Sequence, residues 1–272
     1  MKTRIISGIV MIALVIAVLA VGLLLSPLAI TLFIALLCAV AVYELLCNAS
    51  GIKDKVCITG ACVYAVAMTA VLDVNISKYL KVSSLPFCVT AVYFVFAVIM
   101  ILKNHKDFKL DKIAVFSAMP IFICYAFNTL LGVINHQNGI YYLLLLFNFS
   151  SVCDMGAYFV GVTMGKHKLC PEISPKKTVE GAVGGIVSAV IVALILVLCF
   201  NRSDKIIATL LLTIPLCIVG MLGDLFASSI KRAVGIKDYG TLIPGHGGVL
   251  DRVDSILLIA PILYMFVNFG VI

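Results

Sequence analysis

Charged side chains are scarce in this sequence. Only 12% of its 272 residues are Asp, Glu, Lys or Arg, whereas 63% are hydrophobic and the mean hydropathy is +1.20. A soluble domain carries roughly 25% charged residues, so this composition excludes an ordinary soluble globular protein. The sequence therefore predicts a polytopic membrane protein, for which lipid replaces water around most of the chain.

Paired cysteine motifs are also lacking. The ten cysteines include no C-x-x-C pair and no Cys/His spacing typical of a zinc site. Those inside apolar runs include Cys38, Cys62, Cys88, Cys124, Cys153, Cys199 and Cys217. We interpret these seven as small buried hydrophobic residues, and the pattern implies neither a disulfide framework nor a zinc site.

Long apolar runs dominate the sequence instead. A spanning helix needs about 20 apolar residues, and nine runs qualify. They are 5–25, 28–47, 56–73, 84–102, 113–134, 140–165, 181–200, 206–228 and 253–272. The first run is longer than the roughly 7–15 apolar residues of a signal peptide, so we expect a retained span. The predicted fold class is all-α, a polytopic integral membrane protein with about nine transmembrane helices.

The basic residues favour one side of the membrane. If the N-terminus is cytoplasmic, 16 of the 20 Lys and Arg residues lie inside and four lie outside. The inside set is Lys2, Arg4, Lys53, Lys55, Lys103, Lys106, Lys109, Lys112, Lys166, Lys168, Lys176, Lys177, Lys231, Arg232, Lys237 and Arg252, and the outside set is Lys78, Lys81, Arg202 and Lys205. This asymmetry is a strong positive-inside signal and predicts a multi-pass protein of the cell (inner) membrane with a cytoplasmic N-terminus. The net charge of +7 then reflects topology and contact with anionic lipid headgroups, and it does not indicate a nucleic-acid partner.

Polar residues that break the apolar pattern gather in the second half of the chain. We therefore divide the sequence into N-terminal transmembrane helices, 1–112, which are informative mainly about membrane insertion, and a C-terminal transmembrane region, 113–272, with a site at the cytoplasmic face. Four carboxylates lie at the inner ends of predicted spans: Asp154, Asp224, Asp251 and Asp254. Because an ionisable residue within a membrane is costly, function is the default hypothesis for these carboxylates.

Three of these carboxylates have distinct helix positions. Asp251 and Asp254 are three residues apart at the head of the last span, on one helix face, where helix capping and interfacial anchoring are an alternative to function. Asp224 lies near the end of its span, where the helix dipole disfavours an anion and a nearby cation is needed. Oxygen ligands of this kind suit Mg²⁺ or Mn²⁺, which bind through a few carboxylates, water and substrate phosphates.

Basic residues and glycines accompany the carboxylates at the predicted inner face. The basic set is Lys176, Lys177, Lys231, Arg232 and Lys237. A carboxylate-held metal with several Lys and Arg residues is typical of transfer at phosphorus. Gly240, Gly245, Gly247 and Gly248 would let backbone N–H groups approach a phosphate. A plain glycine-rich turn with lysines that face lipid headgroups is the alternative.

The segment ISPKKTVEG, 173–181, predicts the start of a helix. Ser174 is a good N-cap and Pro175 suits the first helical position, which places Lys176 and Lys177 in the first turn. Lysines are unfavourable there unless an anion is bound, so the segment predicts a phosphate site. Anchoring by positive charge at the inner face is an equally good explanation.

The histidines and the remaining glycines give weaker signals. His246 is flanked by glycines and lies five residues before Asp251, so it could bind phosphate, transfer a proton or brace the turn. The sequence does not choose among these roles. The pairs Gly161/Gly165 and Gly181/Gly185 are small-xxx-small motifs, which favour close helix packing.

Residues 228–254 also resemble the signature of the CDP-diacylglycerol synthases (phosphatidate cytidylyltransferases). The pattern is S-x-apolar-K-R, four residues, K-D-x-small, then P-x-H-G-G-apolar-x-D-R-apolar-D. The matching residues are Ser228, Lys231, Arg232, Lys237, Asp238, Gly240, Pro244, His246, Gly247, Gly248, Asp251, Arg252 and Asp254. The segments with Asp154 to Gly161 and Ile173 to Gly181 look like the family as well, whereas the first 110 residues match only as apolar spans.

The resemblance implies a reaction and a set of residue roles. The reaction converts CTP and phosphatidate into CDP-diacylglycerol and pyrophosphate in phospholipid biosynthesis, with Mg²⁺ required and a second cation left open. By family, Asp224 and Asp251 hold the metal, and we expect them to act with Lys231, Arg232 and His246 as the catalytic set. The expected substrate-binding residues are Ser174, Lys176, Lys177, Lys237, Asp238, Gly247, Gly248 and Arg252, with Asp154 and Asp254 in support. Members of the family are membrane proteins that are often dimeric, so a homodimer is one option.

Two other function classes fit parts of the pattern. A CTP-dependent lipid-alcohol kinase would use similar residues but would move the γ-phosphate. A secondary transporter would explain charges and small residues within spans, although transporters place substrate sites near the midplane and often contain inverted repeats. Here the charges crowd to one end of the spans and no repeat is visible, so the sequence favours the cytidylyltransferase.

Overall fold

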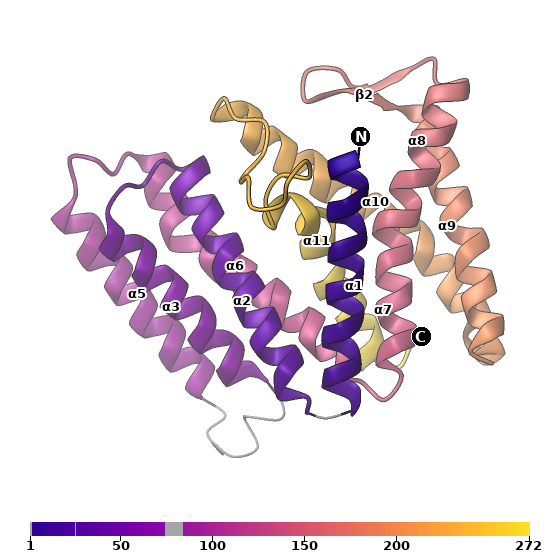
Figure 1. The fold of residues 1–272 in the computed structure, drawn as a ribbon, viewed down its shortest axis with the longest axis horizontal. Coiled ribbons are helices and arrows are strands. Elements are labelled where there is room, and N and C mark those ends of the chain that lie inside the picture. Colours follow the sequence, from indigo (N-terminus) through magenta and orange to yellow (C-terminus); the bar gives the residue numbers. More distant parts are fainter. Residues whose placement is uncertain (1, 25, 74–83) are drawn as a thin grey trace. The chain divides into compact units, whose positions relative to one another are not determined.

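The computed structural model describes residues 2–24, 26–73 and 84–272, and it is almost entirely helical (Figure 1). The chain forms two compact units. Unit 1 contains residues 1–131 and 234–252, and unit 2 contains residues 132–233 and 253–272. The sequence-based division at residue 112 marks a change in polar content along the chain, and it does not coincide with the boundary between the compact units. It stays a prediction.

Unit 1 is a group of packed helices. Its elements are α1 (Lys2–Leu24), α2 (Leu28–Glu44), the π-helix η1 (Leu45–Ala49), α3 (Lys55–Leu72), α5 (Leu85–Lys103) and most of α6 (Leu110–Ile134). α2 packs against α1 and α3, and α3 packs against α5, as Figure 1 shows. Asp54 caps α3 by accepting the N–H of Val56 at 2.8 Å. That hydrogen bond, with a second from Asn104, holds the pKa of Asp54 below its usual value.

Unit 2 combines helices with one short hairpin. Its elements are α7 (Gly139–Phe147), the π-helix η2 (Asn148–Val152), α8 (Cys153–Met164), β1 (Lys168–Cys170), β2 (Ser174–Thr178), α9 (Val179–Cys199), the 3₁₀ turn η3 (Ser203–Lys205), α10 (Ile206–Ala233) and most of α11 (Leu250–Asn268). α9 packs against both α8 and α10. β1 and β2 are antiparallel, with Lys168 opposite Thr178 and Cys170 opposite Ser174.

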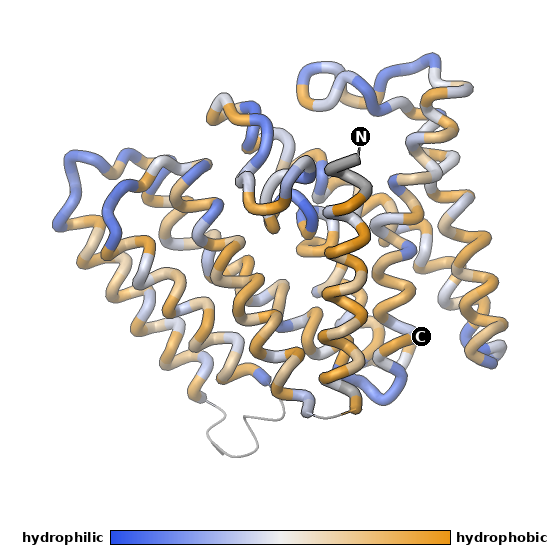
Figure 2. Tube along the Cα trace, viewed as in Figure 1, coloured by the Kyte–Doolittle hydropathy of each residue, from blue (hydrophilic) through white to orange (hydrophobic). Residues whose placement is uncertain are grey.

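The helices have the length and composition of membrane spans, which confirms the predicted helical membrane fold. Among the described residues, seven helices are long and apolar enough to cross a bilayer. The predicted first and ninth spans are also helices, α1 and α11. Within the described residues, the apolar stretch of α1 is Ile6–Gly22, and α11 carries three charged residues at its start. In each unit the helix bodies are hydrophobic and the connecting segments hydrophilic (Figure 2). The count of nine is thus approximate.

The cysteines follow the predicted pattern in part. Cys38, Cys124, Cys153 and Cys217 are buried. Cys88 and Cys199 are exposed on the surface of the chain, so the prediction of burial was wrong for these two. Both lie on long apolar helices, where lipid can cover a side chain that the protein leaves exposed.

The predicted helix start at Ser174 is wrong. Ser174–Thr178 is the strand β2, and α9 begins at Val179. Thr178 is the N-cap, and its hydroxyl accepts the N–H of Gly181 at 3.1 Å. Ser174 and Thr178 are both good cap residues, and pairing of the 174–178 backbone with β1 selects the second. Lys176 and Lys177 therefore lie on a strand and not in a helical first turn.

Small residues bring α8 and α9 together, as the sequence predicted. A Cβ at Gly181 would lie 2.7 Å from the carbonyl oxygen of Ala157, and a Cβ at Gly185 would lie 2.5 Å from that of Cys153. Backbone atoms cannot rotate away as a side chain can, so both positions of α9 are confined to glycine. The close packing fixes the end of α8 beside the start of α9, where the hairpin emerges.

We expect Gly185→Ala to lower the free energy of unfolding by about 1–3 kcal/mol, the usual cost of overpacking. The added methyl group meets the Cys153 carbonyl, so α8 and α9 must separate. Thermal unfolding in detergent measures the effect as a lower Tm. The matched control is Val187→Ala on the same helix, where the side chain is exposed and a change within about 0.5 kcal/mol is expected. An equal Tm for both variants would contradict the packing argument.

Candidate active site

An ion pair between Lys177 and Asp224 is the centre of the polar residues in unit 2. Lys177 lies on β2 and Asp224 on α10, and Nζ and Oδ2 are 2.6 Å apart. Both side chains are about three-quarters buried. Ser228, one helical turn after Asp224, donates a hydrogen bond to Oδ1 at 3.3 Å. The cation that the sequence required for Asp224 is therefore Lys177.

Three further charged residues of unit 2 interact electrostatically with this pair or with one another. The charges of Lys177 and Asp224 act on Asp154 of α8, and those of Asp224 and Lys231 act on Asp254 of α11. Lys231 is only 8% exposed. Close contact between α10 and α11 supports the arrangement, since a Cβ at Gly223 would lie 2.9 Å from the carbonyl oxygen of Asp254. Unit 2 thus brings together three carboxylates and two ammonium groups in an apolar setting.

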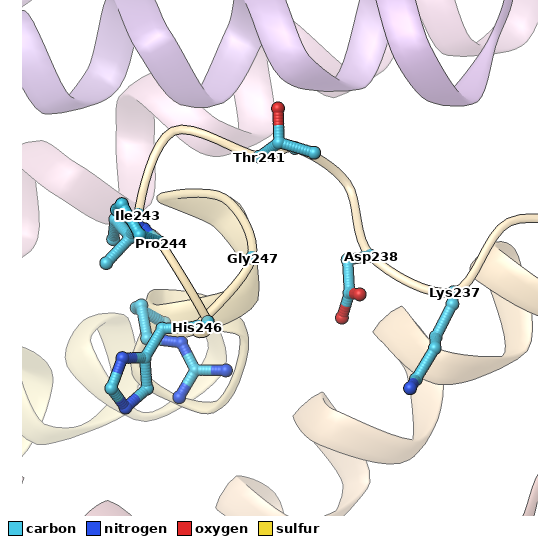
Figure 3. A pocket seen from close by; sticks show the side chains of 10 residues that line it. Lys237, Asp238, Thr241, Ile243, Pro244, His246 and Gly247 are labelled. Carbon is cyan, nitrogen blue, oxygen red and sulfur yellow. The ribbon is translucent and has the colours of Figure 1, made fainter. Parts of the chain in front are cut away.

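A second polar site lies in unit 1, on the segment 234–252. A cavity of about 640 Å³ is lined there by Lys237, Asp238, His246 and Arg252, together with Gly240, Thr241, Ile243, Pro244, Gly245 and Gly247 (Figure 3). The size falls in the range of small-molecule pockets. Two cationic side chains and an imidazole against one carboxylate favour an anionic ligand. The glycine-rich stretch thus forms the wall of a cavity, and its role in phosphate binding stays a prediction.

Asp251 holds the wall of this cavity. It is 7% exposed, and its Oδ2 accepts the backbone N–H of Tyr239 at 2.7 Å and that of Gly248 at 3.0 Å. Gly247 has a φ of 85° and approaches the same carboxylate, so that a Cβ there would lie 2.9 Å from Oδ2. The N–H of Gly248 therefore serves Asp251 in this structure, and the glycines let the chain fold tightly around a carboxylate of the protein itself.

His246 lines the cavity and contacts α1. Its Nδ1 is 2.8 Å from the hydroxyl of Ser7. This contact supports a bracing role for His246, because the hydroxyl fixes the orientation of the ring. Its position on the cavity keeps phosphate binding and proton transfer open as further roles.

Comparison with known proteins identifies the family of this chain. A model of the cytidylyltransferase family matches residues 2–270, nearly the whole chain. The chain belongs to the cytidylyltransferase family. The resemblance seen in residues 228–254 is thereby confirmed, and the protein is an enzyme of the nucleotidyltransferase class.

Individual relatives of this cytidylyltransferase carry one name. A protein of Bacillus subtilis (strain 168) called phosphatidate cytidylyltransferase is 40% identical over 184 residues, which cover 67% of this chain and 68% of the relative. Proteins of the same name from Staphylococcus saprophyticus and Staphylococcus aureus (strain COL) are 46% and 43% identical over 127 residues. That match covers 47% of this chain and 49% of each staphylococcal protein, so it spans about half of their length.

Other residues predicted for the cytidylyltransferase site lie apart from the buried contacts. On β2, Ser174 is partly exposed and Lys176 is exposed. Arg232 is exposed at the end of α10, whereas its neighbour Lys231 is buried. α10 continues to Ala233, beyond the predicted end at 228, so these two basic residues are helical. Asp224 and Asp251, the predicted metal ligands, belong to different units: Asp224 to unit 2 and Asp251 to unit 1.

The sequence analysis missed two residues of α2 and η1. Glu44 is 3% exposed, and its two carboxylate oxygens accept the N–H groups of Val249 and Leu250. Asn48 donates a hydrogen bond to the carbonyl oxygen of Tyr239 at 2.6 Å. The prediction that residues 1–112 bear mainly on insertion was therefore wrong. The signal was present in the sequence, because Glu44 is an ionisable residue in an apolar run.

Proposed function

We propose that this protein transfers CMP from CTP to phosphatidate, which gives CDP-diacylglycerol and pyrophosphate for phospholipid biosynthesis. Membership of the cytidylyltransferase family and the name shared by its relatives support this reaction. The observation that carries the proposal is the cavity lined by Lys237, His246 and Arg252, since its wall is the family signature itself. An anion-binding cavity on that segment is what a nucleoside triphosphate substrate requires.

The chemistry needs charge neutralisation and positioning more than covalent catalysis. An oxygen of the phosphatidate phosphate attacks the α-phosphorus of CTP and forms the new P–O bond. The bond between the α-phosphorus and the bridging oxygen breaks, and pyrophosphate leaves with its electron pair. In unit 1, Lys237 and Arg252 bind phosphate oxygens at the cavity. In unit 2, Lys177 and Lys231 are the cations available to substrate phosphate. No covalent enzyme intermediate is needed.

The carboxylates suit a divalent cation. In unit 2, Asp154, Asp224 and Asp254 outnumber the two lysines that face them, so a further cation would balance the charge. The described residues include no cluster of three or more His, Cys, Asp or Glu side chains arranged for a metal, and Mg²⁺ commonly uses one or two carboxylates with water and substrate phosphates. We assign Mg²⁺ to Asp224 and Asp251 by family resemblance, and leave a second cation open. When bound, it neutralises phosphate charge.

The orientation follows from the distribution of basic residues. A cytoplasmic N-terminus, in the cell (inner) membrane, places 16 of 20 Lys and Arg residues on the inner side. Both polar sites then lie at the cytoplasmic face, where CTP is available and where the headgroup of a lipid substrate is accessible. A homodimer is part of the proposal on the strength of the family alone.

Product analysis tests the reaction. Purified protein in detergent is given phosphatidate, Mg²⁺ and CTP labelled with ³²P at either the α- or the γ-phosphate. We expect the α-label to enter the lipid and the γ-label to appear as pyrophosphate. Reactions without phosphatidate are the control. In a parallel reaction with diacylglycerol as the acceptor, a γ-labelled lipid with released CDP would replace the proposal by a lipid-alcohol kinase. Solute uptake into liposomes without CTP turnover would favour a transporter.

A further inference from the structure

Two side chains at the end of α2 hold the cavity segment from behind. Glu44 is the last residue of α2, and Asn48 lies four positions on, in the π-helix η1. Glu44 Oε1 accepts the N–H of Val249 at 3.0 Å and Oε2 accepts that of Leu250 at 2.9 Å. Asn48 Nδ2 donates to the carbonyl oxygen of Tyr239 at 2.6 Å. All of these residues belong to unit 1.

Glu44 acts as a cap for a helix that is distant in sequence. The first N–H groups of a helix have no partner within the helix, and a negative charge there is favourable. α11 begins at Leu250, so the two N–H groups that Glu44 accepts are at its very start. A buried carboxylate that accepts two charge-assisted hydrogen bonds holds the backbone donors firmly in position.

The glycines of the segment are shaped to this carboxylate. A Cβ at Gly240 or Gly248 would lie 2.4 Å from an oxygen of Glu44. Both glycines therefore let the backbone close over Glu44, one on each side of the cavity residues 241–247. The π-helix contributes as well, since π turns often occur at functional sites, where they displace side chains from the regular helical register.

Tyr239 shows how the segment is held from two sides. Its N–H is bound by Asp251 and its carbonyl oxygen by Asn48. Tyr239 is 1% exposed and lies between the cavity residue Asp238 and the glycine turn. Fixing the peptide groups at both of its ends fixes the direction from which Lys237 and Asp238 face the cavity.

We propose that Glu44 and Asn48 are positioning residues, which hold residues 239–250 as a rigid wall so that Lys237, His246 and Arg252 meet the CTP phosphates in one geometry. The inference rests on the proposed function for its effect on turnover. The predicted rigidity of residues 239–250 does not depend on the proposed function. Rigidity and turnover can therefore be measured separately.

The test compares Glu44→Gln, Glu44→Asp and Asn48→Ala with the control Asn128→Ala. Asn128 is a polar residue of α6 in the same unit, and its side chain donates only to Cys124 of its own helix in the contacts described. Glu44→Gln is the sharp variant, because the amide nitrogen cannot accept an N–H, so one backbone donor faces another donor. Glu44→Asp keeps the charge but shortens the reach, and Asn48→Ala removes a single hydrogen bond.

Two measurements are made on each variant in detergent. Hydrogen exchange monitored by mass spectrometry follows the amides of residues 239–250, and steady-state kinetics give KM and kcat with respect to CTP and to phosphatidate. For Glu44→Gln we expect faster exchange in this segment and a loss of about 10²-fold in kcat/KM for CTP, the scale of a misplacement of roughly 1 Å. The KM for CTP should rise more than the KM for phosphatidate. In both exchange rate and kcat/KM, Glu44→Asp and Asn48→Ala should lie between Glu44→Gln and wild type. The control Asn128→Ala should match wild type.

The outcomes separate the two claims. Unchanged exchange in Glu44→Gln and Asn48→Ala overturns the positioning role, whether or not the protein turns over CTP. Faster exchange with wild-type kinetics overturns the link to catalysis. If the wild type makes no CDP-diacylglycerol, the proposed function fails, while the exchange data still support or overturn the hold that Glu44 and Asn48 have on the segment.

Discussion

Asp224→Asn is expected to lower kcat/KM for CTP by about 10³-fold, a loss of roughly 4 kcal/mol of transition-state stabilisation. Asp224 is 2.6 Å from Lys177 and acts on both Asp154 and Asp254. Its removal leaves the shielded Nζ of Lys177 without its counter-ion and lowers the negative charge available to a divalent cation. Transfer of label from [α-³²P]CTP to phosphatidate measures the loss.

A double-mutant cycle with Lys177→Met separates the two roles of Asp224. If Asp224 only holds Lys177, the double variant is no worse than either single variant. If Asp224 also binds Mg²⁺, Asp224→Asn raises the Mg²⁺ concentration for half-maximal rate and Lys177→Met does not. We expect the second result. The control is Asp204→Asn, which changes an exposed carboxylate in the η3 turn and should match wild type. A wild-type rate for Asp224→Asn would show that Asp224 is not part of the active site.

Asp251→Ala is expected to lower kcat/KM by about 10²–10³-fold. The substitution leaves the N–H groups of Tyr239 and Gly248 without their acceptor, at about 1–3 kcal/mol for each buried donor. The cavity wall would then lose its fixed shape. Steady-state kinetics in detergent, with Asp111→Ala at the exposed start of α6 as the control, provide the measurement.

Asp251→Asn distinguishes shape from charge at this position. The amide keeps one oxygen that can accept both N–H groups, so it preserves the wall but removes the negative charge. We expect a loss of about 10²-fold, because Mg²⁺ prefers a carboxylate ligand. A wild-type rate in Asp251→Asn together with an inactive Asp251→Ala would show that the carboxylate holds the wall and does not bind the metal.

The membrane spans could be predicted from the sequence because they depend on long apolar runs, which the chain displays openly. The ends of the spans could not be placed as well. Hydropathy falls at Ser228 while α10 continues to Ala233, because hydropathy reports the expected contact with lipid and not the backbone hydrogen bonds that define a helix. The helix start predicted at Ser174 was wrong for a related reason, because pairing of residues 174–178 with β1 outweighs a local capping preference.

The sequence predicted which residues take part in the candidate site, but it predicted few of the contacts between them. Asp154, Lys177, Asp224, Lys231 and Asp254 were all identified, and unit 2 brings them together. The particular pairing of Lys177 with Asp224 depends on the hairpin, which periodicity does not reveal. Glu44 escaped because its partners are backbone N–H groups more than 200 residues away, and such donors leave no trace in side-chain patterns.

The distance between Glu44 and its partners also has a consequence for biosynthesis. Val249 follows Glu44 by 205 residues. At a synthesis rate of about 5–20 residues per second, Glu44 is made on the order of 10–40 s before the N–H group of Val249 that it accepts. During this interval Glu44 depends on its place near the end of a strongly apolar helix, from which a carboxylate can extend towards water. The hydrogen bonds from Val249 and Leu250 then form late, after most of the helices have been made. The wall of the cavity can therefore be completed only late in synthesis, and a chain that ends before residue 249 leaves Glu44 without these two backbone donors.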